Sequence, residues 1–532
     1  MDTFNNVIKN KYIILGILIY SVISLLIIFY NHHYFDDEVH NLEMLSLSFT
    51  EIFNIVQYPE KFLKPLTLNV SNNILVFATG DIHSPLSYLL NKTIYSLFSS
   101  YKAILVFSIF INVGALSYFY HYAEKKLADK YSKLLLFIFV FLNGGILMWT
   151  NSVRWYAYWV PLFIILYTFL LKHQKLDTKK LVIVGLLLSL MTYISYLTFL
   201  LIISLFILFL ISRRNDLSFK NILISGALYF SLCLYQLFIF IEVYAQNIES
   251  QTLGVIASTL SAIYGFLNGG SVFPANPVLI FFSFFTLIIM VLGIKTILAN
   301  NKAIDLTIIQ SIVLFVGFIS LMIITGISGK YRNVIALSIP FYFIISYFIT
   351  YIKSVNIKRV YLFSALILSV ISVFNLITHQ DTTKNSYNLP ISKLSVFLQN
   401  PNNKFVITYD YATYFYLKNK NYDFRMLQYE YPKRIIEKGT SIYLIRTYGG
   451  SLRDQQSKEV SQLYEKIERC MQKVHKKEIG IDKYYMIKNK LADIDKKTKK
   501  NPKLPRIQMN ITYGKVKERC SLISHQFLKG FS

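Results

Sequence analysis

The sequence predicts an all-α polytopic membrane domain of about eleven transmembrane helices, followed by a small C-terminal α/β domain. Of the 532 residues, 54% are hydrophobic and only 16% are charged, whereas a soluble globular chain carries about 25% charged residues. Apolar runs of membrane-spanning length recur as far as residue 378, and polar sequence follows. These observations exclude a soluble enzyme, a disordered chain and a disulfide scaffold.

Each predicted span is a run close to the roughly 20 residues that cross the hydrocarbon core as a helix. The first run lacks the small-residue cleavage site of a signal peptide, so we expect it to remain as helix one. The run from Leu181 to Ile211 is too long for one crossing, and we divide it at the polar stretch Thr192 to Tyr196. The predicted spans are 12–30, 102–120, 134–150, 155–171, 181–195, 197–212, 221–243, 275–297, 305–325, 333–352 and 359–378.

Positive charge in the short connections predicts the orientation, because cytoplasmic loops are enriched in Lys and Arg. With the N-terminus in the cytoplasm, the inner connections hold most of these residues. They are Lys9, Lys11, Lys125, Lys126, Lys130, Lys133, Lys172, Lys175, Lys179, Lys180, Arg213, Arg214, Lys220, Lys302, Lys353, Lys358 and Arg359. Eleven spans then place the C-terminal domain outside the cytoplasm.

Two large segments fall on the outer side. The transmembrane domain, residues 1–378, includes a first outer loop at 31–101. Apolar residues recur there at helical spacing after Val39, and again at Leu86, Leu90, Ile94 and Leu97. Helices lying in the membrane interface are expected at both places. The second helix is marked by Ser84 as cap and Pro85 at its first position.

The second outer segment, 379–495, reads as an α/β domain, and residues 496–532 read as a basic, flexible tail. Strands are predicted at 404–409, 441–446 and 484–487, with an amphipathic helix over 460–474. Residues 379–532 hold 30 basic and 14 acidic side chains, so they contribute +16 of the net +26. No nucleic-acid recognition module is present, and a membrane surface or a phosphorylated substrate suits this charge better. A Cys470–Cys520 bridge is one option if this domain lies in an oxidising compartment.

Acidic residues cluster at the mouth of the first helix. Asp36, Asp37 and Glu38 directly follow it, and Asp81 and His83 precede the Ser84-Pro85 helix start. Three adjacent acids at a membrane boundary are costly unless water, a cation or a basic partner meets them. Helix capping and turn formation are the structural alternatives. A carboxylate and an imidazole near a helix N-terminus can instead serve as proton acceptors beside an anion.

Two arginines on the same predicted face supply complementary charge. Arg154 lies between the third and fourth spans, and Arg332 follows Lys330 and Tyr331 at the start of the tenth. A single arginine of this kind often only reaches toward the lipid headgroups. Together with the acids, these residues point to a reaction that deprotonates a nucleophile while a phosphate leaves.

At these residues the chain resembles the GT-C superfamily of integral membrane glycosyltransferases, which use polyprenyl-phosphate-linked sugars. It is most similar to the bacterial branch related to protein mannosyltransferases and lipid A aminoarabinose transferases. The likeness lies in Phe35-Asp36-Asp37-Glu38 and in Asp81-Ile82-His83-Ser84-Pro85-Leu86-Ser87-Tyr88-Leu89-Leu90, with weaker matches at 193–196 and at Tyr331-Arg332. Ser84 stands where the family has its first proline.

The resemblance implies a role for each of these residues. Asp37 would activate the acceptor hydroxyl with support from Glu38 or Asp36, and Asp81 and His83 would complete the site. Arg154, Arg332, Lys330 and Tyr331 would contact the donor phosphate. A divalent cation such as Mg, Mn or Ca, held by Asp36, Asp37 and Asp81, is a further option.

The sequence therefore favours a multi-pass glycosyltransferase of the bacterial inner membrane that acts in the cell envelope. It would transfer a sugar with inversion from a polyprenyl-phosphate donor to a glycan, lipid (including lipopolysaccharide) or protein acceptor, amid membrane lipids and without nucleic acid. The alternatives are a transporter or flippase for lipid-linked glycans, a polysaccharide polymerase and a non-enzymatic scaffold. Scarce glycine and acids at the boundary, not at mid-depth, count against transport.

Overall fold

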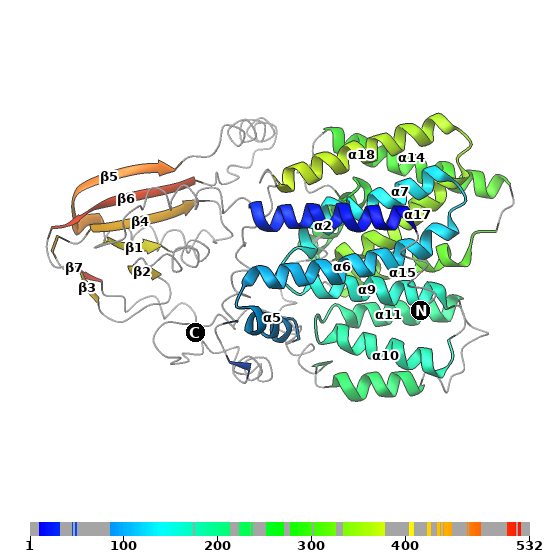
Figure 1. Cartoon of the computed structure of the whole chain (residues 1–532), viewed down its shortest axis with the longest axis horizontal. Coiled ribbons are helices and arrows are strands. Elements are labelled where there is room, and N and C mark those ends of the chain that lie inside the picture. Colours follow the sequence, from blue (N-terminus) through cyan, green and yellow to red (C-terminus); the bar gives the residue numbers. More distant parts are fainter. Residues whose placement is uncertain are drawn as a thin grey trace. The chain divides into compact units, whose positions relative to one another are not determined.

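The computed structural model divides into two units, a helical unit and a sheet unit, and each is described by itself. Figure 1 shows the helices of the first unit and the strands of the second. The structure describes residues 10–31, 45, 48–49, 86–173, 176–212, 223–234, 236–237, 252–270, 277–300, 303–325, 334–377, 404–408, 423–426, 434–436, 438–439, 441–448, 465, 468–479, 508–517 and 520–522.

The helical unit is a bundle of apolar helices. In the described part, the 3-10 turns Glu124–Lys126 and Ile335–Leu337 interrupt it, and a further apolar helix covers Leu223–Leu234. The α-helices are α2 (Lys11–Asn31), α5 (Leu86–Phe98), α6 (Tyr101–Ala123), α7 (Lys130–Phe141), α8 (Gly144–Thr150), α9 (Tyr156–Lys172), α10 (Thr178–Thr192), α11 (Thr198–Ser212), α13 (Thr252–Leu267), α14 (Pro277–Ala299), α15 (Leu306–Thr325), α17 (Ser338–Tyr351) and α18 (Val355–Ile377).

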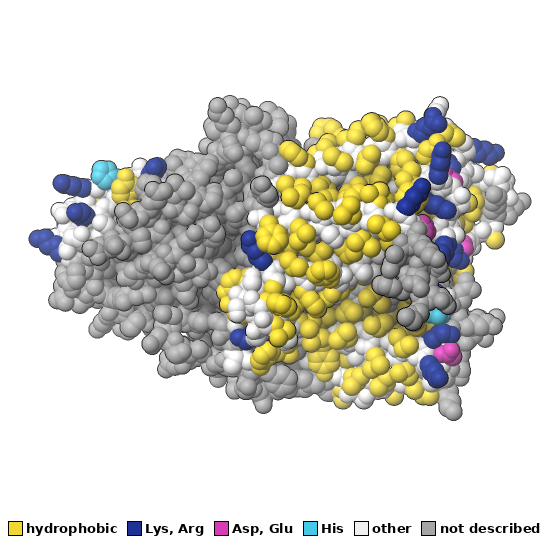
Figure 2. Space-filling view, viewed as in Figure 1, with side chains coloured by type: hydrophobic (Ala, Val, Ile, Leu, Met, Phe, Trp, Pro, Cys, Tyr) yellow, Lys and Arg dark blue, Asp and Glu magenta, His cyan; other side chains and the backbone are white. Residues whose placement is uncertain are grey.

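The predicted membrane domain is confirmed in its coarse form. Among the described residues, six helical segments are long and apolar enough to cross a membrane, and four shorter apolar helices accompany them. Large apolar side chains cover the flank of the unit in Figure 2. Among the exposed apolar residues of its helices, Phe281 is 71% and Phe363 is 64% exposed. A soluble protein rarely exposes a continuous apolar surface of this kind, so the chain is a multi-pass membrane protein. The total of eleven transmembrane helices stays a prediction.

The structure agrees with one predicted break between helices and differs from the prediction at two other places. The division of the 181–211 run is confirmed, because α10 ends at Thr192 and α11 begins at Thr198. The predicted span 134–150 is broken into α7 and α8, and α13 was not predicted. The helix expected after Ser84-Pro85 is present as α5. Leu97 is 72% exposed, while Ser87, Tyr88, Asn91 and Ile94 are buried. At a membrane boundary, the polar face can turn toward the protein.

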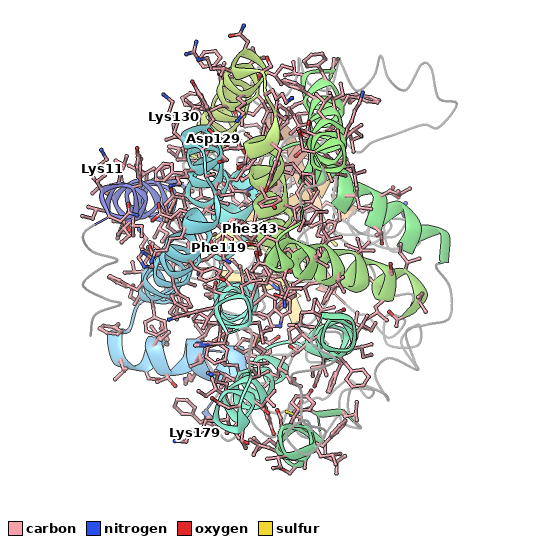
Figure 3. All side chains as sticks on the ribbon, turned by 90° about the vertical axis from the view of Figure 1, so that its right-hand side faces the viewer. Lys11, Phe119, Asp129, Lys130, Lys179 and Phe343 are labelled. Atoms are coloured by element: carbon pink, nitrogen blue, oxygen red, sulfur yellow. The ribbon has the colours of Figure 1, made fainter. Side chains whose placement is uncertain are left out.

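The two ends of the bundle differ in charge. One end, called here the basic end, holds Lys11, the connection 124–129 and the starts of α10, α15 and α18. Lysines and arginines gather there in Figure 2, and Figure 3 looks onto this end, with Lys11, Lys130 and Lys179 at the rim and Phe119 and Phe343 in the middle. The rings of Phe119 and Phe343 meet edge to face at 6.0 Å. The opposite end, called here the Arg154 end, holds α5 and the connections 151–155 and 193–197.

The sheet unit confirms the predicted strands at 404–409 and 441–446. Its main sheet has the order β2-β1-β4-β6-β5, with β1 parallel to β2 and β4, and β6 antiparallel to β4 and β5. A small second sheet pairs β3 with β7. The strands are β1 (Lys404–Thr408), β2 (Asp423–Met426), β3 (Arg434–Ile436), β4 (Ser441–Tyr448), β5 (Met471–Ile479), β6 (Gln508–Val516) and β7 (Cys520–Leu522).

Two expectations for this unit are corrected. The helix predicted over 460–474 is wrong at its end, because β5 begins at Met471. The flexible tail expected from residue 496 contains β6, which lies between β4 and β5 and buries Ile511 and Val516 completely. The predicted strand 484–487 lies outside the described residues. Cys470 is disulfide-bonded and Cys233 is a free thiol, while the side chain of Cys520 is outside the described part.

Candidate functional site

The candidate site is centred on the connection 151–155 between α8 and α9, called here the Arg154 segment. All five residues are buried although none is in a helix or strand. Arg154 itself is 4% exposed. Non-helical backbone at membrane depth is tolerated only where it is buried in protein or lines a watery cavity. A buried guanidinium likewise requires an anionic or hydrogen-bonding environment.

The first helix holds one side of the Arg154 segment. The Tyr20 hydroxyl and the Thr150 Oγ1 lie 2.6 Å apart, and the Asn151 side-chain amide donates to Ser24 Oγ at 2.9 Å. Ser24 lies seven residues before the end of α2, a rise of about 10 Å. The segment is therefore tied to the half of α2 that leads into Asp36, Asp37 and Glu38.

The helix α5 holds a second side. The Asn91 amide nitrogen donates to the Val153 carbonyl at 2.6 Å, and its amide oxygen accepts from the Tyr158 hydroxyl at 2.6 Å. Asn91 is 1% exposed. One side chain thus joins α5, the residue before Arg154 and the first turn of α9. Sequence reasoning missed Asn91, and its position beside the apolar residues of α5 was the available signal.

The connection 193–197 meets the same region. The Leu86 backbone N–H, at the start of α5, donates to the Tyr193 carbonyl at 2.9 Å. The Trp159 indole N–H donates to Thr198 Oγ1 at 2.9 Å, which ties α9 to the start of α11. Leu86 lies three residues after His83, so this contact anchors the chain immediately beyond the Asp81 and His83 motif.

The guanidinium of Arg154 lies against an aromatic ring. Its guanidinium carbon lies 5.8 Å from the centre of the Tyr156 ring, and the Trp155 and Tyr156 rings are 4.2 Å apart. The Arg154 backbone N–H donates to Ser152 Oγ at 3.0 Å. A cation held against an aromatic face in a water-poor place interacts more strongly with an anion than it would at the surface. This arrangement suits an arginine that binds phosphate.

The tenth predicted span also approaches the Arg154 segment. The 3-10 turn Ile335–Leu337, which begins three residues after Arg332 in the chain, packs against α8 and α9. The helices α2 and α5 therefore bond to residues 151–155, while the Ile335–Leu337 turn packs on the helices that flank this segment and the 193–197 connection bonds to the start of α5. Of the predicted site residues, only Arg154 is described. The others lie outside the described residues: Asp36, Asp37, Glu38, Asp81, His83, Lys330, Tyr331 and Arg332.

The divalent-cation site suggested by the sequence also lies outside the described residues, because none of its candidate ligands Asp36, Asp37 and Asp81 is among them. Within the described residues there is no group of three or more His, Cys, Asp or Glu side chains placed to hold a metal ion.

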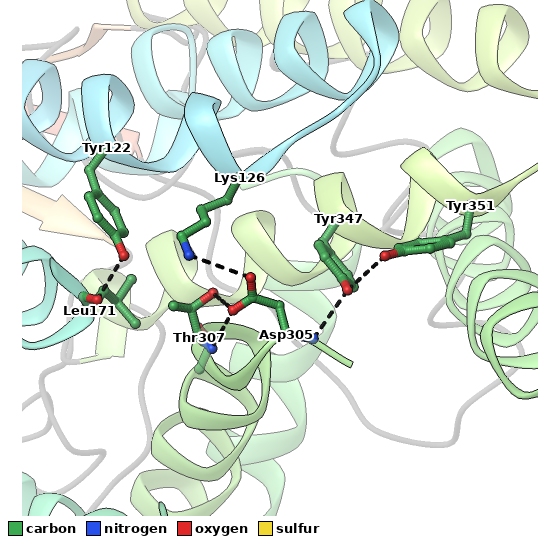
Figure 4. A network of polar contacts seen from close by, with 8 residues as sticks. Tyr122, Lys126, Leu171, Asp305, Thr307, Tyr347 and Tyr351 are labelled. Carbon is green, nitrogen blue, oxygen red and sulfur yellow. Dashed lines mark hydrogen bonds and ion pairs between the residues drawn. The ribbon is translucent and has the colours of Figure 1, made fainter. Parts of the chain in front are cut away.

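A second polar cluster lies at the basic end and is shown in Figure 4. Lys126 pairs with Asp305 at 3.5 Å, and Asp305 accepts from the backbone N–H and hydroxyl of Thr307. The Tyr347 hydroxyl lies 3.3 Å from the Asp305 backbone nitrogen and 2.9 Å from Tyr351. Burial raises the pKa of Asp305, but the bonds from Thr307 and the charge of Lys126 outweigh it and hold the pKa below its usual range. Asp305 thus caps α15 as a carboxylate, which is a structural role.

Comparison with known proteins adds no family to these observations. Neither the scan against protein-family models nor the search of curated proteins finds a match to this chain.

Proposed function

We propose that the protein is a membrane glycosyltransferase of the GT-C type, which transfers a sugar from a polyprenyl-phosphate donor to an acceptor outside the cytoplasm. The observation that carries the proposal is the buried Arg154, held on a non-helical segment where α2, α5 and α9 meet. These contacts hold the Arg154 segment against α2, the helix that precedes Asp37 in the chain, and against α5, the helix that follows Asp81. A base and an anion clamp are the two components that the reaction needs.

In the proposed reaction, Asp37 accepts the proton of the acceptor hydroxyl as its oxygen attacks the anomeric carbon. The bond from that carbon to the phosphate oxygen breaks, and the polyprenyl phosphate leaves with the bonding electron pair. Arg154, with Arg332, Lys330 and Tyr331, stabilises the negative charge that the leaving group gains. Glu38, Asp81 and His83 orient the acceptor. Attack opposite the leaving group inverts the anomeric centre.

Charge and cysteine chemistry support an extracytoplasmic location for the proposed reaction. Cytoplasmic connections are rich in Lys and Arg, so the basic end is assigned to the cytoplasm and the Arg154 end to the outer face of the inner membrane. The disulfide at Cys470 supports an extracytoplasmic sheet unit, since disulfides persist in oxidising compartments.

The test is sugar transfer by the purified protein in lipid vesicles. Asp37→Asn, Asp81→Asn and Arg154→Ala should each abolish incorporation of sugar from a polyprenyl-phosphate donor while the protein level stays unchanged. A general base alone contributes roughly a hundredfold to ten-thousandfold in rate. Lys179→Ala, which removes an exposed cation at the basic end, is the control. Undiminished transfer by all three site variants would refute the assignment.

A transporter or flippase for lipid-linked glycans remains the second candidate, and one observation favours it. The helix pair α7 and α8 is interrupted at Leu142 and Asn143 within the buried core, and broken helices line the binding sites of many transporters. Movement of a labelled lipid-linked sugar across the vesicle membrane without any transfer product would select this function.

A further inference from the structure

A surface groove on α18 lies close to the basic end and outside the candidate site. It has a volume of about 490 Å³. Val360 and Phe363 in this groove are 56% and 64% exposed. Its lining residues are Arg359, Val360, Leu362, Phe363, Ser364 and Leu366. The groove thus combines one cation with apolar walls.

Among the described residues, the hydrogen-bond partner of Arg359 does not compensate its charge. Its Nε donates to the Tyr131 hydroxyl at 3.1 Å, and a phenol hydroxyl carries no charge. Lys130 Nζ lies 5.3 Å from the centre of the same Tyr131 ring. Two cations therefore flank one tyrosine, at the joint between α7 and α18.

The carboxylate of Asp129, two residues before Tyr131 in the chain, is already engaged. Asp129 Oδ2 accepts from Lys358 Nζ at 2.8 Å, and its Oδ1 accepts from the Tyr131 backbone N–H at 2.7 Å. Figure 3 shows Asp129 beside Lys130 at the rim of the basic end. Counting Lys130, Lys358 and Arg359 against Asp129 leaves a local excess of positive charge.

Position along the helix indicates the class of ligand. Arg359 lies in the second turn of α18, and Leu366 lies seven residues further, a rise of about 10 Å into the apolar layer. A cationic mouth at the membrane boundary and an apolar groove beneath it match a charged headgroup joined to an acyl chain. Basic sites between transmembrane helices on the cytoplasmic side bind anionic lipid headgroups, and Lys130 of α7 and Arg359 of α18 lie on either side of Tyr131 where these two helices pack.

We propose that this groove binds an anionic phospholipid, with the phosphate against Arg359 and Lys130 and an acyl chain along Val360, Phe363 and Leu366. The proposal does not depend on the proposed transfer reaction. Each cation near the surface contributes about fivefold to the attraction for anionic lipid. Arg359 and Lys130 together therefore predict a preference of roughly 25-fold.

Native mass spectrometry of the full-length protein in detergent tests this binding. The probes are phosphatidylglycerol and phosphatidylcholine with identical acyl chains. We expect tighter binding of phosphatidylglycerol, a loss of about fivefold in Arg359→Ala or Lys130→Ala, and retention in Arg359→Lys. Phe363→Ser should weaken the binding of both lipids to the same extent, because it shortens the apolar wall without changing the charge.

Lys179→Ala is the matched control, because Lys179 is an exposed cation at the same end and lies far from Lys130 in Figure 3. Equal binding of the two lipids by the unaltered protein would overturn the proposal, as would unchanged affinity in Arg359→Ala. An equal loss in Lys179→Ala would show a general charge effect instead of a site, and would also overturn it. So would displacement of the lipid by millimolar glycerol phosphate, because it would show a plain anion site.

Discussion

Asn91 joins α5 to the Arg154 segment, although Asn91 and Val153 are 62 residues apart in the chain. Its amide donates to a backbone carbonyl and accepts from Tyr158, so both of its polar atoms are used. Buried amides in such positions hold two segments in one register, because losing either bond leaves a polar group unsatisfied. Asn91 is therefore a positioning residue for Arg154.

Replacing Asn91 with Leu should lower the stability of the protein by about 1 to 3 kcal/mol, because the Val153 carbonyl and the Tyr158 hydroxyl lose their partner in a buried place. The measurement is thermal unfolding in detergent. Thr93→Ala on the exposed face of the same helix is the control, since its hydroxyl bonds only within the helix. Equal unfolding temperatures for the two variants would contradict the bridging role of Asn91.

For single residues, the sequence predicted Arg154 as a site residue but did not predict that its side chain is buried. An arginine next to Trp155 and Tyr156 reads equally well as an anchor at the headgroups. What distinguishes the two readings is the set of bonds from Ser24 and Asn91 to its neighbours. Those partners are distant in sequence, so local pattern carries no information about them.

At the level of helices and strands, the break between α7 and α8 also depends on partners that are distant in the sequence. The apolar run 134–150 predicts one helix, and Asn143, Gly144 and Gly145 are the local sign of an interruption. The structure explains it through residues far along the chain. The Gly145 N–H donates to the Gly270 carbonyl at 2.8 Å, and the Asn143 amide donates to the Gly269 carbonyl at 3.2 Å. By contrast, the polar stretch 192–196 was a sufficient local signal for the break between α10 and α11.

Gly270 is required at this crossing for two reasons. Its φ of +72° is in the left-handed region, and an added Cβ would collide with the side chain of Asn143. We expect Gly270→Ala to destabilise the protein by more than the roughly 1 to 2 kcal/mol of the backbone conformation alone. The readout is the unfolding temperature in detergent.

The matched control for Gly270 is Gly226, which lies in the helix Leu223–Leu234, where an added methyl group would meet no neighbouring atom. Alanine there should be neutral or stabilising by up to about 1 kcal/mol. If Gly270→Ala unfolds at the same temperature as Gly226→Ala, the crossing between α8 and the 268–270 turn does not contribute to stability.

For the whole molecule, composition was enough to predict a membrane protein with a separate polar domain, because both follow from the overall distribution of apolar residues. The order of the strands within the sheet could not be predicted from the sequence. β6 pairs with β4 and β5 although it lies in a Lys-rich stretch, where the charge obscured the alternation of Ile511 and Tyr513. Strand pairing over such distances depends on partners that periodicity cannot identify.

The orientation of the whole molecule can be tested directly. The described acids of the helical unit also lie at the basic end, where Asp129, Asp177 and Asp305 pair with lysines, yet Lys and Arg remain in excess there. Orientation follows this excess. A reporter active only outside the cytoplasm, fused after Gln399, should therefore be active. The same reporter inserted after Lys179 should be silent.

The two fusions separate the possible outcomes. With the N-terminus in the cytoplasm, an even number of crossings before residue 399 would silence the reporter fused after Gln399. A reporter that is active only in the cytoplasm would then be active at the same position. That result would place the sheet unit in a reducing compartment, where the disulfide at Cys470 would not persist. Activity at both fusion points would mean that charge does not determine the orientation of this chain. Only activity at Gln399 with silence at Lys179 agrees with a sheet unit outside and a basic end in the cytoplasm.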